Sequence, residues 1–422
     1  MSNSFSKEER VAFEDILEGF DDALVLSRNV SIANMSQQEM ERSNDTIWRP
    51  QPYIATSIDA PAGTDISTEF TDATQLTVPS RIGFNKTVPW TLTVKELRDK
   101  LQEGSLGKAA KQKLASDINV AVMNVASLQG SMVVARPDAA TGFDDVALCE
   151  AIMNEQGVMG GDRYLALSTR DYNGMAGNLA GRQNLQTKSI TAYERAYVGQ
   201  VASFETYKLD YANRLAANAV TATMNTTTSQ IDYVPLATVA TATGTNNIDN
   251  RYQQITTTTN TGTAVGDCFT IAGIESVHHI TKQATGQPKT FRVISVDSST
   301  TMTISPPIIS ASSTPTDAEL QYKNCEAVTV GATAAITFLN IVAASANPFW
   351  HKDAIELMPG RYQIDSGSGA AVMRASTDQG IELVMTKQFD INTNKFKYRM
   401  DTLFGVNLLQ PEMAGVMLFG QT

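Results

Sequence analysis

The chain has 422 residues, of which 42% are hydrophobic and only 18% charged, with a formal net charge of −11 and a pI near 4.9. This length allows two or three domains with cores of their own. The shortage of charge favours a subunit that hides part of its surface against neighbours, over a lone protein with neutral Thr- and Ala-rich surfaces. An acidic chain does not neutralise phosphates, which argues against sequence-independent binding of DNA or RNA.

The cysteines and the N-terminal sequence indicate no disulfide framework, zinc site or targeting signal. Cys149, Cys268 and Cys325 are odd in number and far apart, so they indicate neither a disulfide framework nor a zinc site, which suits a reducing cytoplasm. The start of the chain has no basic region followed by an apolar one, so we expect no signal peptide. No apolar run is long enough to span a membrane.

The first predicted element is an amphipathic helix from Lys7 to Phe20, with Ser6 as N-cap and Glu9 at the capping-box position. One face is apolar and the remainder is crowded with acidic residues. It is either an ordinary surface helix or an acidic arm that docks a basic partner, and chain termini are often loose enough to serve as arms.

Residues Arg49 to Thr93 form a Pro-, Thr- and Ser-rich stretch whose five prolines exclude a long helix. We expect short strands at Gln75 to Val78, Arg81 to Phe84 and Val88 to Thr93. So long a stretch without a core is unusual inside a compact domain, and it fits a projecting hairpin that packs on another subunit.

Helical and mixed patterns follow. We predict a short helix from Val94 to Leu101 and a long one from Ser105 to Gln129, because apolar residues recur there every three or four positions. Residues 142–222 alternate between helix and strand, which indicates an α/β or α+β block. Its expected elements are helices at Phe143 to Asn154 and Thr169 to Leu179, and strands at Arg163 to Ser168 and Ala202 to Leu209.

From about Thr221 the sequence becomes rich in Thr, Gly and Asn, which is typical of short strands joined by turns. Residues 223–345 therefore predict an all-β domain, a small barrel or sandwich, inserted into the mixed host, with a helix near Ala334 to Ala343. The expected strands are Cys268 to Ile271, Phe291 to Val296, Thr301 to Ile304 and Ala327 to Val330. From Lys395 to Leu418 we expect a long strand, a break at Gln410-Pro411 and a final strand.

The sequence holds no recognisable catalytic motif. Phosphate-binding, dinucleotide-binding and nucleophile-elbow patterns are absent. The adjacent His278 and His279 point to opposite faces of a strand and cannot readily share a metal ion, and His351 stands alone. Cys149 is expected to be buried and inert. Asp144 and Asp145 fall at a helix start, where they favour the positive end of the dipole. We therefore predict no enzyme, no metal and no cofactor.

Three stretches resemble a known family. Ser43 to Pro50 (SNDTIWRP) is similar to the segment that enters the long projecting loop of P-22-type phage coat proteins. Asn347 to Ala354 (NPFWHKDA) is similar to the stretch where the chain of that family returns from its inserted domain. Arg399-Met400-Asp401, through Gly405 to Pro411-Glu412, resembles the closing strands of HK-97-fold capsid proteins. The order of elements matches over essentially the whole chain.

The resemblance implies an α+β, HK-97-like capsid fold with an inserted all-β barrel domain. Its expected parts are an N-terminal arm (1–48), an extended projecting loop (49–93), a peripheral domain with a spine helix (94–141), an axial domain in two segments (142–222 and 346–390), the inserted barrel (223–345) and C-terminal strands (391–422).

The function implied is that of a major capsid protein of a tailed bacteriophage. It would form pentamers and hexamers of an icosahedral shell, expected to be T=7, with a scaffolding protein and a portal protein as partners. The shell would enclose double-stranded DNA without sequence-specific binding, and it would be assembled in the host cytoplasm without a membrane.

Two contact sites are predicted. The acidic helix would meet a basic scaffolding protein through Glu14, Asp15 and Glu18, because its charge is one-sided. In the family, a loop of the inserted domain helps join capsomers. The matching region here is Thr241 to Arg251, whose only charges are Asp249 and Arg251, fewer than the resemblance leads us to expect.

Two other readings remain open. An encapsulin-like nanocompartment can share this fold, and neighbouring genes would separate the two. A phage adhesion or tail-surface protein could use a Thr-rich β-domain to bind glycans, but the long helix and mixed domain argue against it. Closed shells in electron microscopy would exclude a fibre or a soluble binder. A hydrolase comes last, since no nucleophile and base are visible.

Overall fold

The structure is a computed structural model, and contacts within the chain divide it into two compact units. Unit 1 comprises Met1–Ile47, Ser80–Met123 and Ile355–Asn407, and unit 2 comprises Trp48–Pro79, Asn124–Ala354 and Leu408–Thr422. The structure describes residues 5, 9–11, 13–14, 16–17, 20, 24–33, 46–52, 57, 59–67, 70, 72–93, 95–96, 100–158 (backbone alone for 100–106), 160–181, 198–227, 232–242, 244–311, 314–327, 333–362, 364 and 369–422.

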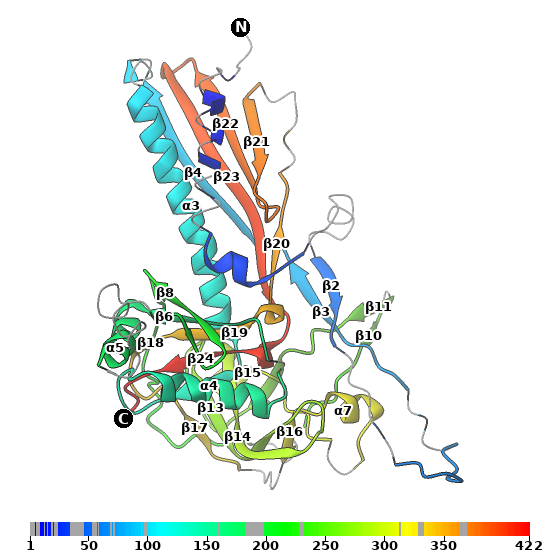
Figure 1. Cartoon of the computed structure of the whole chain (residues 1–422). Helices are drawn as coiled ribbons and strands as arrows, with labels where there is room; N and C mark the ends of the chain where they lie inside the picture. The colour runs from blue at the N-terminus through cyan, green and yellow to red at the C-terminus, as the bar shows by residue number, and fades with distance from the viewer. Residues whose placement is uncertain are drawn as a thin grey trace. The chain divides into compact units, whose positions relative to one another are not determined.

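Unit 1 is built on a mixed sheet with a long helix (Figure 1). The sheet has the order β1-β20-β23-β22-β21, and β4 pairs with β23. Every second residue of β23 at its core, including Tyr398 and Met400, is buried, as expected of a half-buried strand. The elements are β1 (Ser31–Ile32), β4 (Phe84–Thr93), β20 (Ile355–Pro359), β21 (Ala371–Ser376), β22 (Glu382–Asp390) and β23 (Lys395–Leu408).

The long helix of the sequence prediction is confirmed as α3 (Lys100–Gln129), whose Leu114, Ile118 and Val122 are fully buried. The expected break near Gly104 is wrong, because α3 already begins at Lys100. A glycine inside a helix costs only about 1 kcal/mol relative to alanine, too little to interrupt a helix held by tertiary packing.

The N-terminal helix is present in its described residues, which are helical at 9–11, 13–14, 16–17 and 20. Phe13, Ile16 and Phe20 are buried while Val11 and Glu14 are exposed, so the predicted amphipathic character is confirmed there. A 3-10 turn, η1 (Leu26–Asn29), follows, and Leu26 N donates to Asn119 Oδ1 of α3 at 3.2 Å.

Unit 2 contains a mixed sheet with helices α4 and α5, and the elements predicted for this block are confirmed. The sheet order is β5-β24-β19-β6-β8-β7, with parallel pairs β5–β24 and β6–β8. All six residues of β6 are buried, as predicted for RYLALS. The elements are β5 (Met132–Ala135), α4 (Phe143–Glu155), β6 (Arg163–Ser168), α5 (Thr169–Ala180), β7 (Gln200–Val201), β8 (Phe204–Leu209), β19 (Asn347–His351) and β24 (Ala414–Leu418).

A second sheet of unit 2 closes on itself. Its order is β12-β15-β14-β13-β16, and β17 pairs with β13 beside β16. The short segment at Asn225 and Thr226 bridges to Ala335, next to β17, and to Thr257, next to β12, which joins the two edges. Phe269, Phe291 and Met302 are buried inside. The strands are β12 (Gln253–Thr256), β13 (Cys268–Val277), β14 (Ala284–Val296), β15 (Thr301–Ser305), β16 (Cys325–Ala327) and β17 (Ile336–Phe338).

The helix predicted at Ala334 to Ala343 is wrong, because that stretch contains β17 and leads into β18 (Ala344–Ser345). Pairing with β13 overrides the local helical preference of Ala-rich sequence. An unpredicted helix, α7 (Asp317–Tyr322), begins with a capping box between Thr316 and Glu319.

Two hairpins complete the fold. β2 (Thr46–Pro50) pairs with β3 (Thr77–Arg81) at the base of the predicted projecting loop, and β10 (Thr238–Thr241) pairs with β11 (Gly244–Asn247). The remaining short elements are β9 (Arg214–Leu215), η3 (Lys352–Ala354) and η5 (Pro411–Met413). Within the described part of the chain, none of the helices has the length and apolar character needed to cross a bilayer.

Candidate functional site

The acidic helix carries one described residue of the predicted docking site. Glu14 is exposed and lines a cavity of about 600 Å³ with Arg10, Phe5, Phe13 and residues 370–375. Asp15 and Glu18 lie outside the described residues. Because Arg10 is also exposed, the described surface around Glu14 is mixed in charge. The contact with a basic partner stays a prediction.

Another acidic residue of this helix is used inside unit 1. Glu9 Oε1 pairs with Lys387 Nζ of β22 at 2.5 Å, and both side chains are nearly buried. The Lys387 ammonium also lies over the rings of Phe396 and Tyr398, 5.1 and 5.5 Å from their centroids. A cation held by a carboxylate and two aromatic faces anchors the helix firmly, so not all of its acidic residues are free for a partner.

Asp249 and Arg251 pair with each other. Arg251 Nη2 lies 2.6 Å from Asp249 Oδ2 and Nε lies 2.9 Å from Oδ1, a bidentate geometry. Arg251 is only 8% exposed and its Nη1 also donates to the carbonyl oxygen of Leu408. The pair follows the β10–β11 hairpin, whose eight strand residues are all exposed. A role between capsomers stays a prediction.

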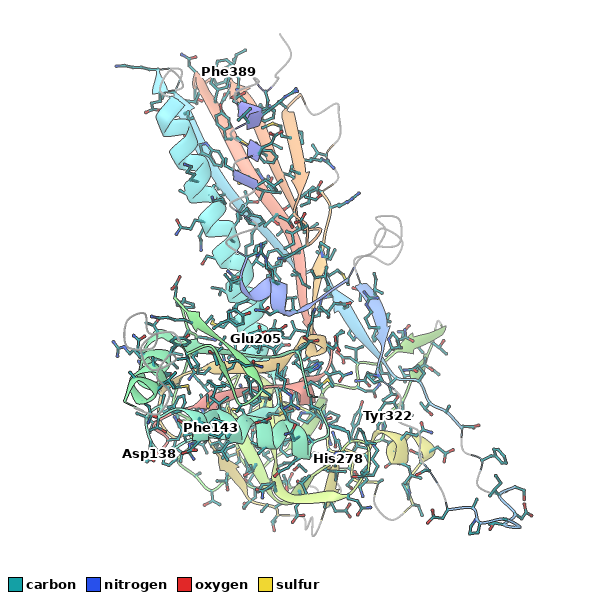
Figure 2. The ribbon with its side chains drawn as sticks, in the orientation of Figure 1. Asp138, Phe143, Glu205, His278, Tyr322 and Phe389 are labelled. Atoms are coloured by element: carbon teal, nitrogen blue, oxygen red, sulfur yellow. The ribbon has the colours of Figure 1, made fainter. Side chains whose placement is uncertain are left out.

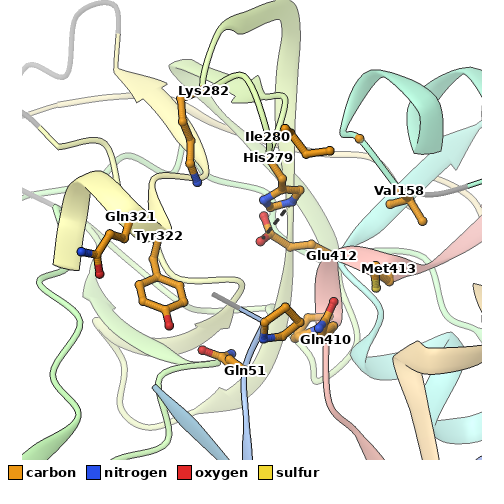
Figure 3. Close-up of a pocket in the computed structure, with 13 residues that line it drawn as sticks. Gln51, Val158, His279, Ile280, Lys282, Gln321, Tyr322, Gln410, Glu412 and Met413 are labelled. Atoms are coloured by element: carbon orange, nitrogen blue, oxygen red, sulfur yellow. Dashed lines mark ion pairs between the residues drawn. The ribbon is translucent and has the colours of Figure 1, made fainter. Parts of the chain in front are cut away.

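A cleft of about 190 Å³ in unit 2 brings together segments that are remote in sequence (Figure 3). We call it the Glu412 cleft. Its walls come from the start of the projecting loop, the end of α4, the turn after β13, α7 and η5. Most of the lining is apolar, and its apolar members are Pro52, Val158, Ile280, Tyr322, Pro411 and Met413.

Local sequence explains how these segments meet. Pro411 occupies the first turn of η5, where its fixed φ and missing N–H are tolerated, and this turn presents Glu412. Gly157, at φ +83°, ends α4 and leaves room for the His278 ring, which would lie 2.9 Å from any Cβ at this position. The backbone N–H of His279 then donates to the carbonyl oxygen of Gln156 at 3.1 Å.

One wall of the Glu412 cleft is charged. Glu412 forms an ion pair with Lys289, which is almost fully buried and also donates to the carbonyl oxygen of Asn324 at 3.1 Å. His279 Nε2 lies 3.5 Å from Glu412 Oε2 (Figure 3). Lys282 Nζ donates to the carbonyl oxygen of Lys323 at 3.0 Å and forms no ion pair with the described residues.

Burial and neighbouring charges move the pKa values of this wall. Burial lowers the pKa of Lys282 to about 8, aided by Lys289 and Lys323 and opposed by Glu412. Burial also lowers the pKa of His279, with Glu412 opposing. For Glu412, burial acts to raise the pKa, but Lys289 and His279 outweigh it and the net shift is downward. The wall therefore holds an ionised carboxylate beside an excess of cationic groups.

The remaining candidate residues have structural roles. Asp145 accepts hydrogen bonds from Thr141, Gly142 and Arg136 at the start of α4, and these outweigh the effect of burial and lower its pKa. Cys149 is fully buried, which raises its thiol pKa far above the ordinary value. The described residues contain no group of three or more His, Cys, Asp or Glu side chains that could hold a metal ion.

Sequence reasoning missed the Glu412 cleft. The sequence analysis placed His278 and His279 on a strand, which is wrong, because β13 ends at Val277 and both residues follow it in a turn. There His279 meets Glu412 from the far end of the chain. No local spacing could have revealed this pair, because the turn after β13 and η5 meet only in the folded unit. The sequence offered one indication of this site. The predicted break at Gln410-Pro411 marked the turn before the last strand, where Glu412 lies.

The projecting loop has a fixed base. Gln51 N donates to the carbonyl oxygen of Leu76 at 2.9 Å across β2 and β3. On α7, Gln321 Nε2 donates to the carbonyl oxygen of Asp72 at 2.8 Å, and Tyr322 Oη donates to that of Thr74 at 3.0 Å. Figure 2 labels Tyr322, the last residue of α7.

The far part of the loop is solvent-exposed. All its described residues at 57, 59–67 and 70 are exposed, and Phe70 is 80% exposed. The hydrogen bonds described there, from Thr64 N to Pro61 O and from Ser67 N to Asp65 Oδ1, stay within the loop. The described residues of this stretch are all exposed and form no core.

Comparison with known proteins gives one family match and several similar structures. A family model described as P22 coat protein, gene protein 5, matches residues 1–420. The chain is similar to the CUS-3 coat protein I-domain, with 39% identity over 29% of this chain and 99% of that one and a TM-score of 0.23. It is also similar to a Mycobacterium phage Che8 structure (9% identity, 93% and 90% covered, TM-score 0.44) and to the bacteriophage PhiM1 mature capsid (9%, 93% and 85%, TM-score 0.44).

Proposed function

We propose, on the premise that this chain belongs to the P22 coat protein family, that it is a major capsid protein whose copies form the pentamers and hexamers of an icosahedral shell. The family is one of structural coat proteins and not of enzymes. The observation that carries the proposal is the family match over residues 1–420. Its shell would enclose phage double-stranded DNA, with T=7 geometry.

The fold that we propose is HK-97-like with an inserted β-barrel at 223–345. The closure of the sheet through Asn225 and Thr226 supports a barrel, and its separate buried cluster around Phe269 and Phe291 supports an independent core. The arm (1–48), projecting loop (49–93), peripheral domain (94–141), axial segments (142–222 and 346–390) and closing strands (391–422) would form the host.

The β10–β11 hairpin and the projecting loop would join copies of the chain. A two-stranded hairpin is marginally stable alone, so the fully exposed β10–β11 hairpin gains stability by packing on a neighbour. The bidentate pair of Asp249 and Arg251 would then support the base of this inter-capsomer hairpin, while its exposed Thr and Asn side chains would make the contact. The projecting loop would lie on the adjacent subunit.

The partners follow from charge and family. A basic scaffolding protein would dock on the acidic N-terminal helix through Glu14, Asp15 and Glu18, and a portal protein would occupy one vertex. The net charge of −11 supports enclosure of DNA without tight binding, since the wall repels phosphates. Assembly would take place in the host cytoplasm, and the mature protein would reside in the virion.

Electron microscopy tests this function directly. The chain is expressed with and without the scaffolding protein of the same phage, and the particles are imaged. Closed icosahedral shells are expected, with uniform size when the scaffolding protein is present. A protein that stays monomeric under both conditions, or that forms fibres, would contradict the proposal.

A further inference from the structure

Two features of unit 2 are complementary in size and character. Phe70 is an 80% exposed aromatic side chain on a stretch without a core. The Glu412 cleft is a largely apolar hollow of about 190 Å³. A dry cavity of about 150 Å³ holds benzene, which is the ring of a Phe side chain, whereas small-molecule sites usually occupy about 300–1,000 Å³. The cleft therefore fits one large side chain better than a metabolite.

The charges around the two features are also complementary. Between Pro50 and Ser80 the sequence carries four acidic residues, Asp59, Asp65, Glu69 and Asp72, and no Lys or Arg. Asp65 accepts a hydrogen bond from Ser67 N, which lowers its pKa and keeps it ionised. At the cleft, the Lys282 ammonium forms no ion pair with the described residues and would gain from an incoming carboxylate.

We infer that Phe70 of one copy inserts into the Glu412 cleft of a second copy, with Asp65 of the same loop meeting Lys282. The inference rests on the proposed shell function and names the contact between neighbouring copies. The loop and the cleft are different surfaces of one chain, so in a pentamer or hexamer the contact is heterologous and repeats around the ring.

The base of the loop makes this contact efficient. Hydrogen bonds to Gln321 and Tyr322 of α7 hold the returning arm just beyond Phe70. A side chain presented from a fixed base loses less conformational entropy on docking than one on a free tail. An aromatic anchor that becomes buried in a fitted pocket has the character of a binding hot spot.

The main test is a disulfide between copies. Phe70→Cys is combined with Ile280→Cys, which replaces a 64% exposed residue on the cleft wall. The natural cysteines at 149, 268 and 325 are all buried, so background reaction is low. Assembled shells under mild oxidation are expected to give a ladder of linked subunits that collapses on reduction. The matched control pairs Phe70→Cys with Tyr211→Cys, an exposed residue elsewhere in unit 2, and should give no ladder.

Three outcomes overturn the inference. Shells of normal appearance without a ladder show that Phe70 docks elsewhere. A ladder of equal strength in the control shows non-specific collision. A disulfide formed within dilute monomers shows that the loop fills the cleft of its own chain. If the unmodified chain forms no shells at all, the proposed function fails instead, and the two failures are thereby distinguished.

If the Phe70→Cys variant does not assemble, a second experiment still tests the inference. Asp65→Lys and Lys282→Glu are compared singly and together, after the stability of each monomer is measured. Each single change is expected to raise the critical concentration for assembly about tenfold. The double change is expected to bring this concentration most of the way back to that of the unmodified chain. Equal, additive losses in the double variant would contradict the inference.

Discussion

His279 Nε2 and Glu412 Oε2 lie 3.5 Å apart in the cleft of unit 2, joining the turn after β13 to the segment that precedes the final strand. Lys289 holds the same carboxylate from β14. One carboxylate thus links η5 to two parts of the β13–β14 hairpin. Its ionisation state controls how well they are held together.

Acid should destabilise the folded chain through these two groups. The pKa of His279 is below its ordinary value in the folded chain, so unfolded chains take up this proton first and stability falls as the pH drops below about 6.5. The lowered pKa of Glu412 adds a further loss as the pH falls below about 4.5. Urea unfolding from pH 7 to 4 should show both steps, and His279→Gln should remove the first. An unchanged slope in this variant would contradict the assignment.

Lys282 should titrate near pH 8. Its pKa of about 8 lies well below the ordinary 10.5, so the unfolded chain binds more protons between these values and stability rises with pH across that window. Reductive ¹³C-methylation and NMR of the monomer should show one lysine signal shifting near pH 8, and Lys282→Gln should delete it. A set of lysines that all titrate above pH 10 would refute this prediction.

Removing Arg292 should destabilise unit 2 strongly. Its fully buried guanidinium donates to the carbonyl oxygens of Gly130 at 3.0 Å, Gly266 at 2.6 Å and Ser127. Arg292→Met removes the guanidinium donors of these buried acceptors, and each acceptor left unpaired costs about 1–3 kcal/mol. We expect a loss of about 3 kcal/mol or more in urea unfolding. The exposed Arg374→Met, which breaks a 3.8 Å ion pair with Glu382, should cost less than about 1 kcal/mol.

A methyl group at position 405 should disturb unit 1. A Cβ on Gly405 would lie 2.1 Å from the carbonyl oxygen of Arg81, so β23 and the chain beside it must separate. Gly405→Ala should cost at least about 1–3 kcal/mol, as overpacking does. Gly83→Ala is the matched control, because nothing lies within 4 Å of its added Cβ. Equal melting temperatures of the two variants would show that the backbone at Gly405 moves to accept a methyl group at no cost, which contradicts the prediction.

Charge reversal of the acidic helix should block assembly with the scaffolding protein. Replacing Glu14, Asp15 and Glu18 by Lys removes the attraction for a basic partner. Glu9 is left intact, because its ion pair with Lys387 anchors the helix. Co-sedimentation of scaffolding protein with particles measures the effect, and a loss of most of it is expected. Unchanged procapsid assembly would rule out this docking site.

Periodic patterns were the most predictable part of the fold. The strand Arg163 to Ser168, the helix from Phe143 and the break at Pro411 lie where the sequence indicated, because buried strands, amphipathic helices and prolines impose local constraints. The stretch from Ala334 failed for the opposite reason. Its Ala-rich composition favours a helix, and only the partner strand β13 made Ile336–Phe338 extended.

The contact residues were less predictable than the elements. Asp249 and Arg251 were singled out as a charged loop, and the structure adds that they satisfy each other. The isolated character of the β10–β11 hairpin could not be read from Thr and Asn alone, since such residues occur equally in loops that pack on their own domain.

By itself, the sequence determined the acidic charge, the family membership, the long helix α3 and the exposed, Pro-rich loop that carries Phe70. These depend on composition and on spacing within one segment. Only the tertiary structure decided that Glu412 meets His279 and Lys289, and that the edges of the second sheet close through Asn225 and Thr226. Such contacts join residues far apart in the chain, and their energy depends on burial and distance, which exist only after the chain has folded.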